Sequence, residues 1–239
     1  MDMSLTATIL EKTTLSEQVK TYILNLITEQ KLNPGTEVPS EKQLIETLGV
    51  SRGVIREAFQ SLSTLGVLDI SSGKRPRVQT VNPTALGTIF HYSMATRQVS
   101  ASQILELRCA LEVNCAGLAA IHGTEQDFEQ LREEMKQIRI SFGNHQQFII
   151  HDARFHLILA SATNNPLYSL LLQALRASLE ESIAAGLQAQ DSQKHAEQIV
   201  DFHQQITNCV CARDAEGARK TMQAHFDSAI NALINSAKI

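Results

Sequence analysis

The sequence lacks any long hydrophobic run and any leader-like start, and both absences narrow the class of protein. No stretch of the 239 residues approaches the roughly 18 consecutive apolar residues of a membrane span. The opening MDMSLTATILEK has neither the basic flank nor the apolar block of a signal peptide. Hydrophobic residues make up 43% of the chain, enough for ordinary cores in two domains or one large domain. We therefore expect a soluble, globular, cytoplasmic protein without membrane contact.

Cysteine is scarce, and its spacing argues against a metal knuckle. The four cysteines form no C-x-x-C pair and fall within helical patterns: Cys109, Cys115, Cys209 and Cys211. They are predicted to be buried thiols instead of zinc ligands or disulfide partners.

The chain also lacks the basic excess that a nucleic-acid binder commonly has. Its formal net charge is −4, although affinity for DNA comes largely from neutralising phosphates. Over the first 80 residues nine basic and nine acidic side chains cancel, so the acidity lies in the remainder. Because the arginines between 52 and 77 cluster while the acids are scattered, we expect a locally positive surface there.

Two short helices are predicted between residues 40 and 64. Ser40 and Gln43 fit the S-x-x-Q capping box that begins a helix, and Gly49 suits the turn that follows. Ser51 is a candidate N-cap for the second helix. Its apolar positions share one face: Ile55, Ala58, Phe59 and Leu62. This arrangement predicts a helix-turn-helix.

The second helix has the polar face that a recognition helix needs. Arg52, Arg56 and Gln60 run along a face separate from the apolar one. An arginine at the start of such a helix bonds a guanine edge through two donors or clamps a phosphate. The positive end of the helix dipole also favours phosphate.

A basic hairpin is predicted directly after this helix. Residues 67–70 alternate as in a short strand, and SSG supplies a turn before KRPRV. The hairpin would form a wing that reaches the DNA backbone or a narrow minor groove. Taken alone, a basic hairpin is explained equally well as a solvated surface. Its position beside the two helices favours the wing.

Residues 14–79 resemble the winged helix-turn-helix of the GntR family of bacterial transcription regulators. The family's order and spacing are found in PG at 34–35, PSE at 39–41, GVSR at 49–52 and REA at 56–58. The resemblance implies DNA contacts from the helices at Lys42, Ser51, Arg52, Gly53 and Arg56, and from the wing at Gly73, Lys74, Arg75 and Arg77. Two departures stand out. Lys42 replaces a more frequent arginine and so loses the bidentate fork. Arg75-Pro76 replaces a frequent second glycine, which leaves the path of the wing open.

From about Ser100 onward the pattern is all helical. Strand signals vanish, and apolar stripes at helical spacing follow one another with short breaks, as in an antiparallel helical bundle. We predict helices over 101–122, 125–142, 145–162, 165–187, 192–212 and 215–236, with Asp214 as the N-cap of the last. The predicted organisation is a DNA-binding domain at 1–80, a linker with a short helix at 81–100, and a helical domain at 101–239. The fold class is mostly α.

Four side chains in the helical half have the types and spacing of a metal site. Asp152 and His156 lie four apart on one predicted helix, so they share a face. His203 and His225 lie in the middle of the last two helices, which should be antiparallel neighbours. Imidazole and carboxylate together suit Zn²⁺, with Ni²⁺, Mn²⁺ or Fe²⁺ also compatible. The spacing alone is more typical of hydrogen-bonded core histidines than of a metal site. His151 lies about 100° from Asp152 on the helix and should point away.

Residues 101–228 resemble the all-helical effector domain, called FCD, of the FadR-like branch of GntR regulators. LELRCALEVNCAGLAA, HDARFHLILASATNNPLYSLL and FHQQITNCVCARDAEGARKTMQAHF stand in the family's order. The resemblance implies that Asp152, His156, His203 and His225 bind a divalent metal. It also implies that Arg108 holds a carboxylate of the effector, although an ion pair with Glu112 one turn away explains Arg108 equally well. Asn165 could also face this pocket, and a turn or cap is its simpler role.

These observations predict a ligand-responsive transcription regulator. The expected partners are operator DNA, a small carboxylate or sugar-acid effector, and a second copy of the chain in a homodimer that reads two half-sites. We expect a repressor and no enzyme. Two alternatives remain: a metal-dependent hydrolase, which would need a base that the sequence does not place, and a metal-free dimer that binds DNA constitutively.

Overall fold

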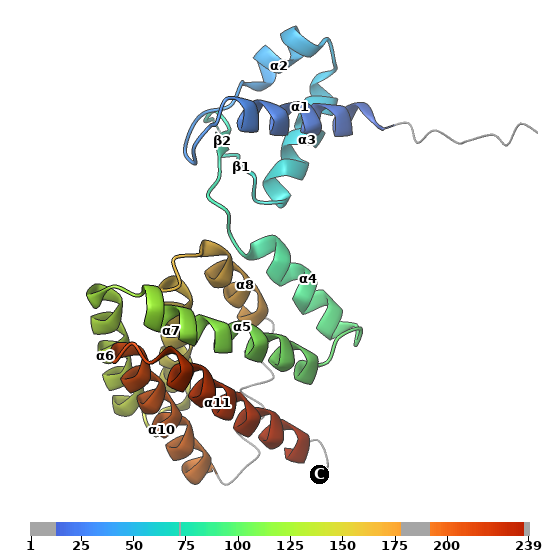
Figure 1. Cartoon of the computed structure of the whole chain (residues 1–239). Helices are drawn as coiled ribbons and strands as arrows, with labels where there is room; N and C mark the ends of the chain where they lie inside the picture. Colours follow the sequence, from blue (N-terminus) through green and yellow to red (C-terminus); the bar gives the residue numbers. More distant parts are fainter. Residues whose placement is uncertain (1–12, 72, 178–191, 237–239) are drawn as a thin grey trace, which may run out of the picture. The chain divides into compact units, whose positions relative to one another are not determined.

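The computed structural model describes residues 13–71, 73–177 and 192–236 (Figure 1). The chain divides into two compact units, one up to Ala85 and one from Leu86. The first unit is a winged helix-turn-helix and the second is a helical bundle, so the predicted fold class is confirmed. Within the described part of the chain, no helix is long and apolar enough to cross a membrane.

The first unit contains α1 (Leu15–Glu29), α2 (Glu41–Leu48) and α3 (Arg52–Thr64), followed by β1 (Leu68–Asp69) and β2 (Arg77–Val78). The predicted capping box is present: Gln43 N donates to Ser40 Oγ at 3.3 Å, and Ser40 N donates to Gln43 Oε1 at 2.9 Å. Ser51 caps α3 as predicted, since its hydroxyl accepts from Val54 N. These local bonds place the start of α3.

The core of this unit lies where α1 and α3 pack, with α2 and the hairpin closing it. Its buried members come from every element: Val19, Ile23, Val38, Leu44, Ile55, Ala58, Phe59, Leu62, Leu68 and Val78. All four apolar positions predicted for α3 are buried. Burying them together holds the polar face of α3 outward.

The wing is anchored on both sides at its base. β1 and β2 pair antiparallel, with Leu68 opposite Val78. The chain at residues 35–38 adds to the other side of β2, because Val38 N donates to Pro76 O at 2.9 Å and Val78 N donates to Thr36 O at 2.9 Å. The sequence left the backbone path of the wing open because Arg75-Pro76 replaces a glycine. In the structure, the hydrogen bond to Pro76 O fixes that path at the base of the wing.

Gly49 sits at the turn between α2 and α3 with φ of 67°, the left-handed region. We expect Gly49→Ala to destabilise this unit by about 1–2 kcal/mol, because a Cβ is strained at this φ although space is free around it. Gly53→Ala is the matched control, since Gly53 is helical and a Cβ would meet only Ser51 Oγ at 3.8 Å. That substitution should stabilise the helix by up to about 1 kcal/mol. Amide hydrogen exchange of α2 and α3 in the full chain measures both. Equal effects of the two would contradict the backbone assignment.

The second unit begins at Leu86, within α4 (Thr84–Ala95). Its other described helices are α5 (Ala101–His122), α6 (Glu125–Ile140), α7 (His145–Ser161), α8 (Pro166–Ala177), α10 (Ser192–Cys211) and α11 (Ala215–Ser236). α4 is the short helix predicted at 81–100. Its Phe90 and Met94 pack against Ile104 and Leu175, so from Leu86 the predicted linker is part of this unit. Residues 178–187 of the predicted fourth helix lie outside the described residues.

α5 is the central helix of the bundle and packs along α11, with α7, α8 and α10 also against it (Figure 1). The core includes Phe128, Phe155 and Phe226, each nearly inaccessible to solvent. The last two described helices are neighbours as predicted, and Asp214 caps α11 by accepting from Gly217 N at 2.9 Å. This packing brings polar side chains of five helices to one place inside the bundle.

Candidate functional site

The exposed face of α3 carries the predicted DNA-contacting side chains. Arg52, Gly53 and Arg56 are exposed, and Arg52 makes no hydrogen bond or ion pair among the described residues. Arg56 Nε lies 3.1 Å from both carboxylate oxygens of Glu41. Lys42 is exposed too and lies 3.9 Å from Glu46. Among the described residues, Arg52 is therefore the cation of this surface that has no acid paired with it.

At the wing the cations differ in how strongly they are held. Arg77 Nη2 lies 2.8 Å from Glu37, and its Nη1 donates to Gly35 O at 3.0 Å. Arg75 is 3.6 Å from the same carboxylate. Lys74 is exposed beside Gly73, whose φ is 74°. Arg77 thus fastens the wing base, and Lys74 and Arg75 are the cations placed nearer the tip.

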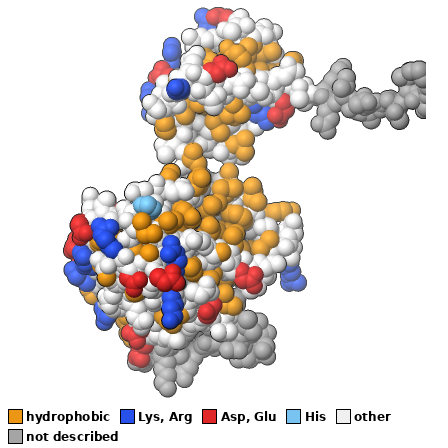
Figure 2. All heavy atoms as spheres, viewed as in Figure 1, with side chains coloured by type: hydrophobic (Ala, Val, Ile, Leu, Met, Phe, Trp, Pro, Cys, Tyr) orange, Lys and Arg blue, Asp and Glu red, His pale blue; other side chains and the backbone are white. Residues whose placement is uncertain are grey.

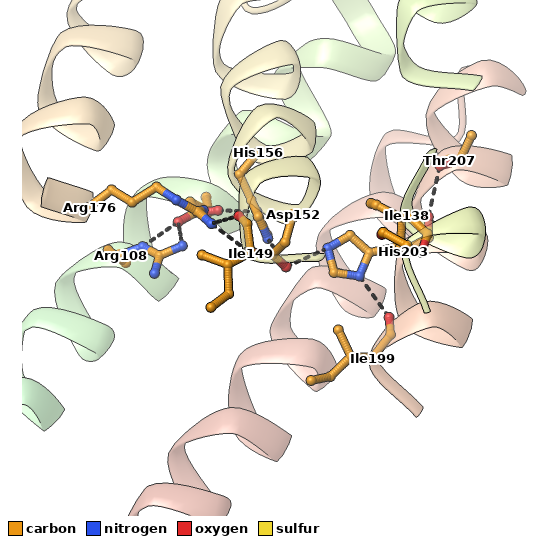
Figure 3. A network of polar contacts seen from close by, with 11 residues as sticks. Arg108, Ile138, Ile149, Asp152, His156, Arg176, Ile199, His203 and Thr207 are labelled. Atoms are coloured by element: carbon orange, nitrogen blue, oxygen red, sulfur yellow. Dashed lines mark hydrogen bonds and ion pairs between the residues drawn. The ribbon is translucent and has the colours of Figure 1, made fainter. Parts of the chain in front are cut away.

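Inside the bundle, three histidines from three helices converge. His156 on α7, His203 on α10 and His225 on α11 are buried, and one ring nitrogen of each lies within 4.8 Å of the others. Asp152 joins them from one turn before His156: its Oδ1 is 3.2 Å from His203 Nε2 and 3.8 Å from His156 Nε2 (Figure 3). The four side chains predicted as ligands are therefore close together in this structure.

The hydrogen bond made by His203 shows which of its ring nitrogens is available to a cation. His203 Nδ1 donates to Ile199 O at 2.7 Å, so in the neutral ring Nε2 carries a lone pair. That lone pair faces the carboxylate oxygen of Asp152, and two acceptors attract only through a proton or a metal ion between them. Among the described residues, His203 Nε2 and His225 Nδ1 are also buried without a hydrogen-bond partner. The residues present fit a divalent metal bound by imidazole and carboxylate.

Outer partners orient the first of these histidines. His156 Nδ1 pairs with Glu112 Oε2 on α5, which turns Nε2 toward Asp152. Arg108 in turn lies 2.8 Å (Nε) and 2.7 Å (Nη2) from Glu112 Oε1. A carboxylate behind a ligating histidine fixes its tautomer and raises its basicity. Arg108, Glu112 and His156 therefore form one buried chain that ends at the cluster.

The electrostatics of the cluster keep its carboxylates ionised. Burial raises the pKa of Glu112, but the charges of Arg108 and His156 outweigh it and bring the pKa to about 2. Burial acts likewise on Asp152, and the Arg176 guanidinium holds its pKa well below the usual range. Burial with the neighbouring histidines lowers the pKa of His225 well below its usual value. Neutral His225 is the form that binds a metal.

His156 behaves differently from His225. Burial lowers its pKa, but Glu112 and then Asp152 outweigh this and raise it above the ordinary value. A metal ion at Nε2 must therefore displace a proton, and metal affinity falls as the pH falls.

Glu112 and Arg176 are the members of this cluster for which the sequence predicted no role toward a ligand. Arg176 on α8 donates from Nη2 to Asp152 Oδ2 at 2.6 Å and to Ile149 O at 3.3 Å (Figure 3). One feature of the sequence could have pointed to Arg176: it is the single arginine within the apolar stretch LYSLLLQALRASL, and a buried arginine needs a partner. The sequence does not say which partner.

The structure gives the contacts of the two predicted effector residues and of the histidine that was not predicted as a metal ligand. Arg108 makes the ion pair with Glu112 that was the alternative to effector binding. Asn165 is exposed and accepts from Leu167 N at 3.1 Å at the start of α8, which is the simpler of its two predicted roles, and its contact with an effector stays a prediction. His151 points away from the cluster as predicted and contacts Glu134 on α6 at 2.5 Å.

Comparison with known families agrees with both units. A profile of the FCD domain matches residues 103–228, and the profile of the bacterial regulatory proteins of the gntR family matches residues 15–78. The chain is a GntR-family transcription regulator with an FCD domain. This family consists of regulators, so the hydrolase alternative is set aside and the protein is not an enzyme.

Relatives of this GntR regulator cover nearly the whole chain. The HTH-type transcriptional regulator YcbG of Bacillus subtilis is 30% identical over 214 residues, covering 89% of this chain and 87% of YcbG. The HTH-type transcriptional repressor NanR of Salmonella newport is 28% identical over 221 residues, covering 90% and 83%. The solved structure of Streptococcus agalactiae GntR aligns at a TM-score of 0.70 and 24% identity, covering 90% and 99%, which shows the shared fold.

Proposed function

We propose that this GntR regulator is a metal-dependent sensor of a small organic acid and represses transcription by binding operator DNA as a homodimer. The observation that carries the proposal is the convergence of Asp152 with His156, His203 and His225 inside the effector domain. Zn²⁺ is the first candidate, with Ni²⁺, Mn²⁺ and Fe²⁺ as alternatives. A bound cation would draw a carboxylate or sugar acid into the bundle. Such a regulator acts in the cytoplasm, where bacterial DNA lies.

The DNA contacts proposed are those of α3 and the wing. Arg52 and Arg56 would enter the major groove with Ser51 and Gly53 at the start of α3, and Lys42 would reach the backbone from α2. Gly73, Lys74 and Arg75 would follow the adjacent groove or backbone, with Arg77 stabilising the wing base. The name of NanR as a repressor supports the same direction of control for this chain.

An apolar surface supports the proposal of a homodimer. Ile89 and Tyr92 on α4 are 61% and 62% exposed, and Leu107 on α5 is 47% exposed. Figure 2 shows hydrophobic side chains gathered on the face of the second unit that carries α4 and α5. A patch of this kind marks an interaction surface. A second copy docked there would give two recognition helices for two symmetric half-sites.

We expect the correct organic acid to change operator affinity about 5–150-fold, the usual range for coupling between two sites. The acid is first found by thermal shift on Zn²⁺-loaded protein, because a ligand raises apparent stability by mass action. Operator DNA is selected by the protein from random duplexes and used in mobility shifts at fixed salt. The control is His225→Ala, which should bind the operator without responding to the acid. Acids that stabilise the protein but leave operator affinity unchanged would contradict the proposal.

A further inference from the structure

Arg176 is the buried cation of the cluster whose hydrogen-bonding capacity is only partly used. Its side chain is 7% exposed, and among the described residues only its Nη2 has acceptors, Asp152 Oδ2 and Ile149 O. Nε and Nη1 are buried without a hydrogen-bond partner in the same part of the chain. These two nitrogens carry three of the five N–H donors of the guanidinium group. Buried donors without acceptors are rare and call for an explanation.

Arg108 does not share this property. Its Nε and Nη2 are both engaged by Glu112, and the guanidinium also lies 5.4 Å from the centroid of the Phe226 ring. None of its nitrogens is among the buried atoms without a partner in the described part of the chain. The two arginines of the cluster therefore differ: Arg108 is committed to the support of His156, and Arg176 has donors to spare.

The charge of the cluster gives the second argument. Arg108 and Arg176 contribute two positive charges, and Glu112 and Asp152 contribute two negative charges, so the four cancel. A divalent metal held by neutral histidines would leave this buried cluster with an excess of two positive charges. Uncompensated charge inside a protein is costly. A ligand with one or two negative charges restores the balance.

We infer that Arg176 is the anion-binding residue of the effector site, holding Asp152 toward the metal through Nη2 and offering Nε and Nη1 to an oxygen of the effector. The inference rests on the proposed metal site and assigns the role to Arg176 instead of Arg108. The class of ligand is a small anion, a dicarboxylate or a carboxylate with a second oxygen donor. A neutral compound of the same shape would not compensate the two positive charges, so we expect it not to bind.

The test compares Arg176→Gln with Arg108→Gln in the full chain. Each substitution removes one arginine behind one metal ligand, and an outer-shell change of this kind costs about 10–100-fold in metal affinity. Titration calorimetry with Zn²⁺ alone measures this loss of metal affinity. Both variants are then saturated with Zn²⁺, so that differences in metal content do not affect the binding of the probes. Malonate is the anionic probe and malonamide its neutral counterpart, with binding read from the rise in melting temperature.

The expected results separate the two arginines. The wild type and Arg108→Gln should bind malonate with similar affinity and ignore malonamide, while Arg176→Gln should bind malonate at least about tenfold more weakly. Equal malonate binding by Arg176→Gln and the wild type would overturn the inference, as would an equal loss in both variants. If Arg176→Gln fails to fold by circular dichroism, Arg176→Lys keeps the charge but lacks the Nε and Nη1 donors, and must still bind malonate more weakly.

Failure of the proposed function looks different from failure of this inference. A wild type that takes up no metal from the divalent series overturns the proposed function. A wild type that binds Zn²⁺ but does not respond to malonate overturns the role of Arg176 and leaves the metal site standing.

Discussion

His203→Ala is expected to lose more than about 100-fold in affinity for Zn²⁺, because it removes a ligand where an outer-shell change alone costs about 10–100-fold. His203 is fully buried at the centre of the cluster, with Nδ1 held by Ile199 O and Nε2 facing Asp152. No described side chain beside it offers a replacement imidazole at that position. Titration calorimetry and elemental analysis of the purified protein measure the loss.

His151→Ala is the matched control for this experiment. His151 precedes Asp152 directly in the sequence, but it contacts Glu134 on α6 and takes no part in the cluster. The control should therefore keep its metal with nearly wild-type affinity. Equal metal content in His203→Ala and His151→Ala would show that the histidines are core residues held by hydrogen bonds, the alternative that the spacing left open.

The buried charges of the cluster argue that it is retained for function. Arg108, Glu112 and Arg176 are buried, and the side chain of Asp152 is 21% exposed, inside a bundle whose core is apolar. Burying such groups costs several kcal/mol per ion before pairing, and well-packed hydrophobic residues are often as stable or more stable. Perturbed pKa values of Glu112 and Asp152 accompany this arrangement, as they do at functional sites. A bundle that served only to hold two DNA-binding domains together would not need these charges.

The helix starts were predictable because the signals are local. Ser40 with Gln43, Ser51 and Asp214 each bond a backbone group three residues away, so the sequence holds both partners of the bond. The shared face of Asp152 and His156 follows for the same reason from one helical turn. The pairing of Arg108 with Glu112 is equally local, and it proved to be the geometry that the structure has.

The partners that join different helices could not be read in this way. Arg176 meets Asp152 across 24 residues of sequence, and Glu112 meets His156 across 44. Whether these side chains meet depends on the rotation and axial offset of α5, α7 and α8, and a sequence pattern places helix boundaries only to within about 2–4 residues. The resemblance to a family named the four candidate ligands, and the structure added the residues that contact them.

Arg52→Ala is expected to weaken specific operator binding by at least about 30-fold. A bidentate contact between arginine and guanine contributes about 1–3 kcal/mol, and a symmetric dimer would lose two of them, which gives about 2–6 kcal/mol. Arg52 is exposed at the first position of α3 and has no acid against it among the described residues. Mobility shifts at fixed salt with operator and with unrelated duplex measure specific and non-specific affinity.

Two further variants separate base reading from charge. Arg52→Lys keeps the charge and loses the fork, so it should retain non-specific affinity while specific affinity falls. Arg132→Ala on α6 removes another exposed arginine, paired with Glu129 at 3.0 Å, and should leave both affinities unchanged. If Arg52→Ala and Arg132→Ala bind the operator alike, α3 is not the recognition helix.

Arg56 should matter less than Arg52, and the reason lies in Glu41. The pair that Arg56 makes with Glu41 is exposed, so it contributes only about 0–1 kcal/mol and DNA can displace it. When DNA breaks this pair, the carboxylate of Glu41 is left near the phosphates, and their repulsion offsets part of the affinity that Arg56 contributes. Arg56→Ala is therefore expected to cost less affinity than Arg52→Ala, and the reverse order would place the main base contact one turn further along α3.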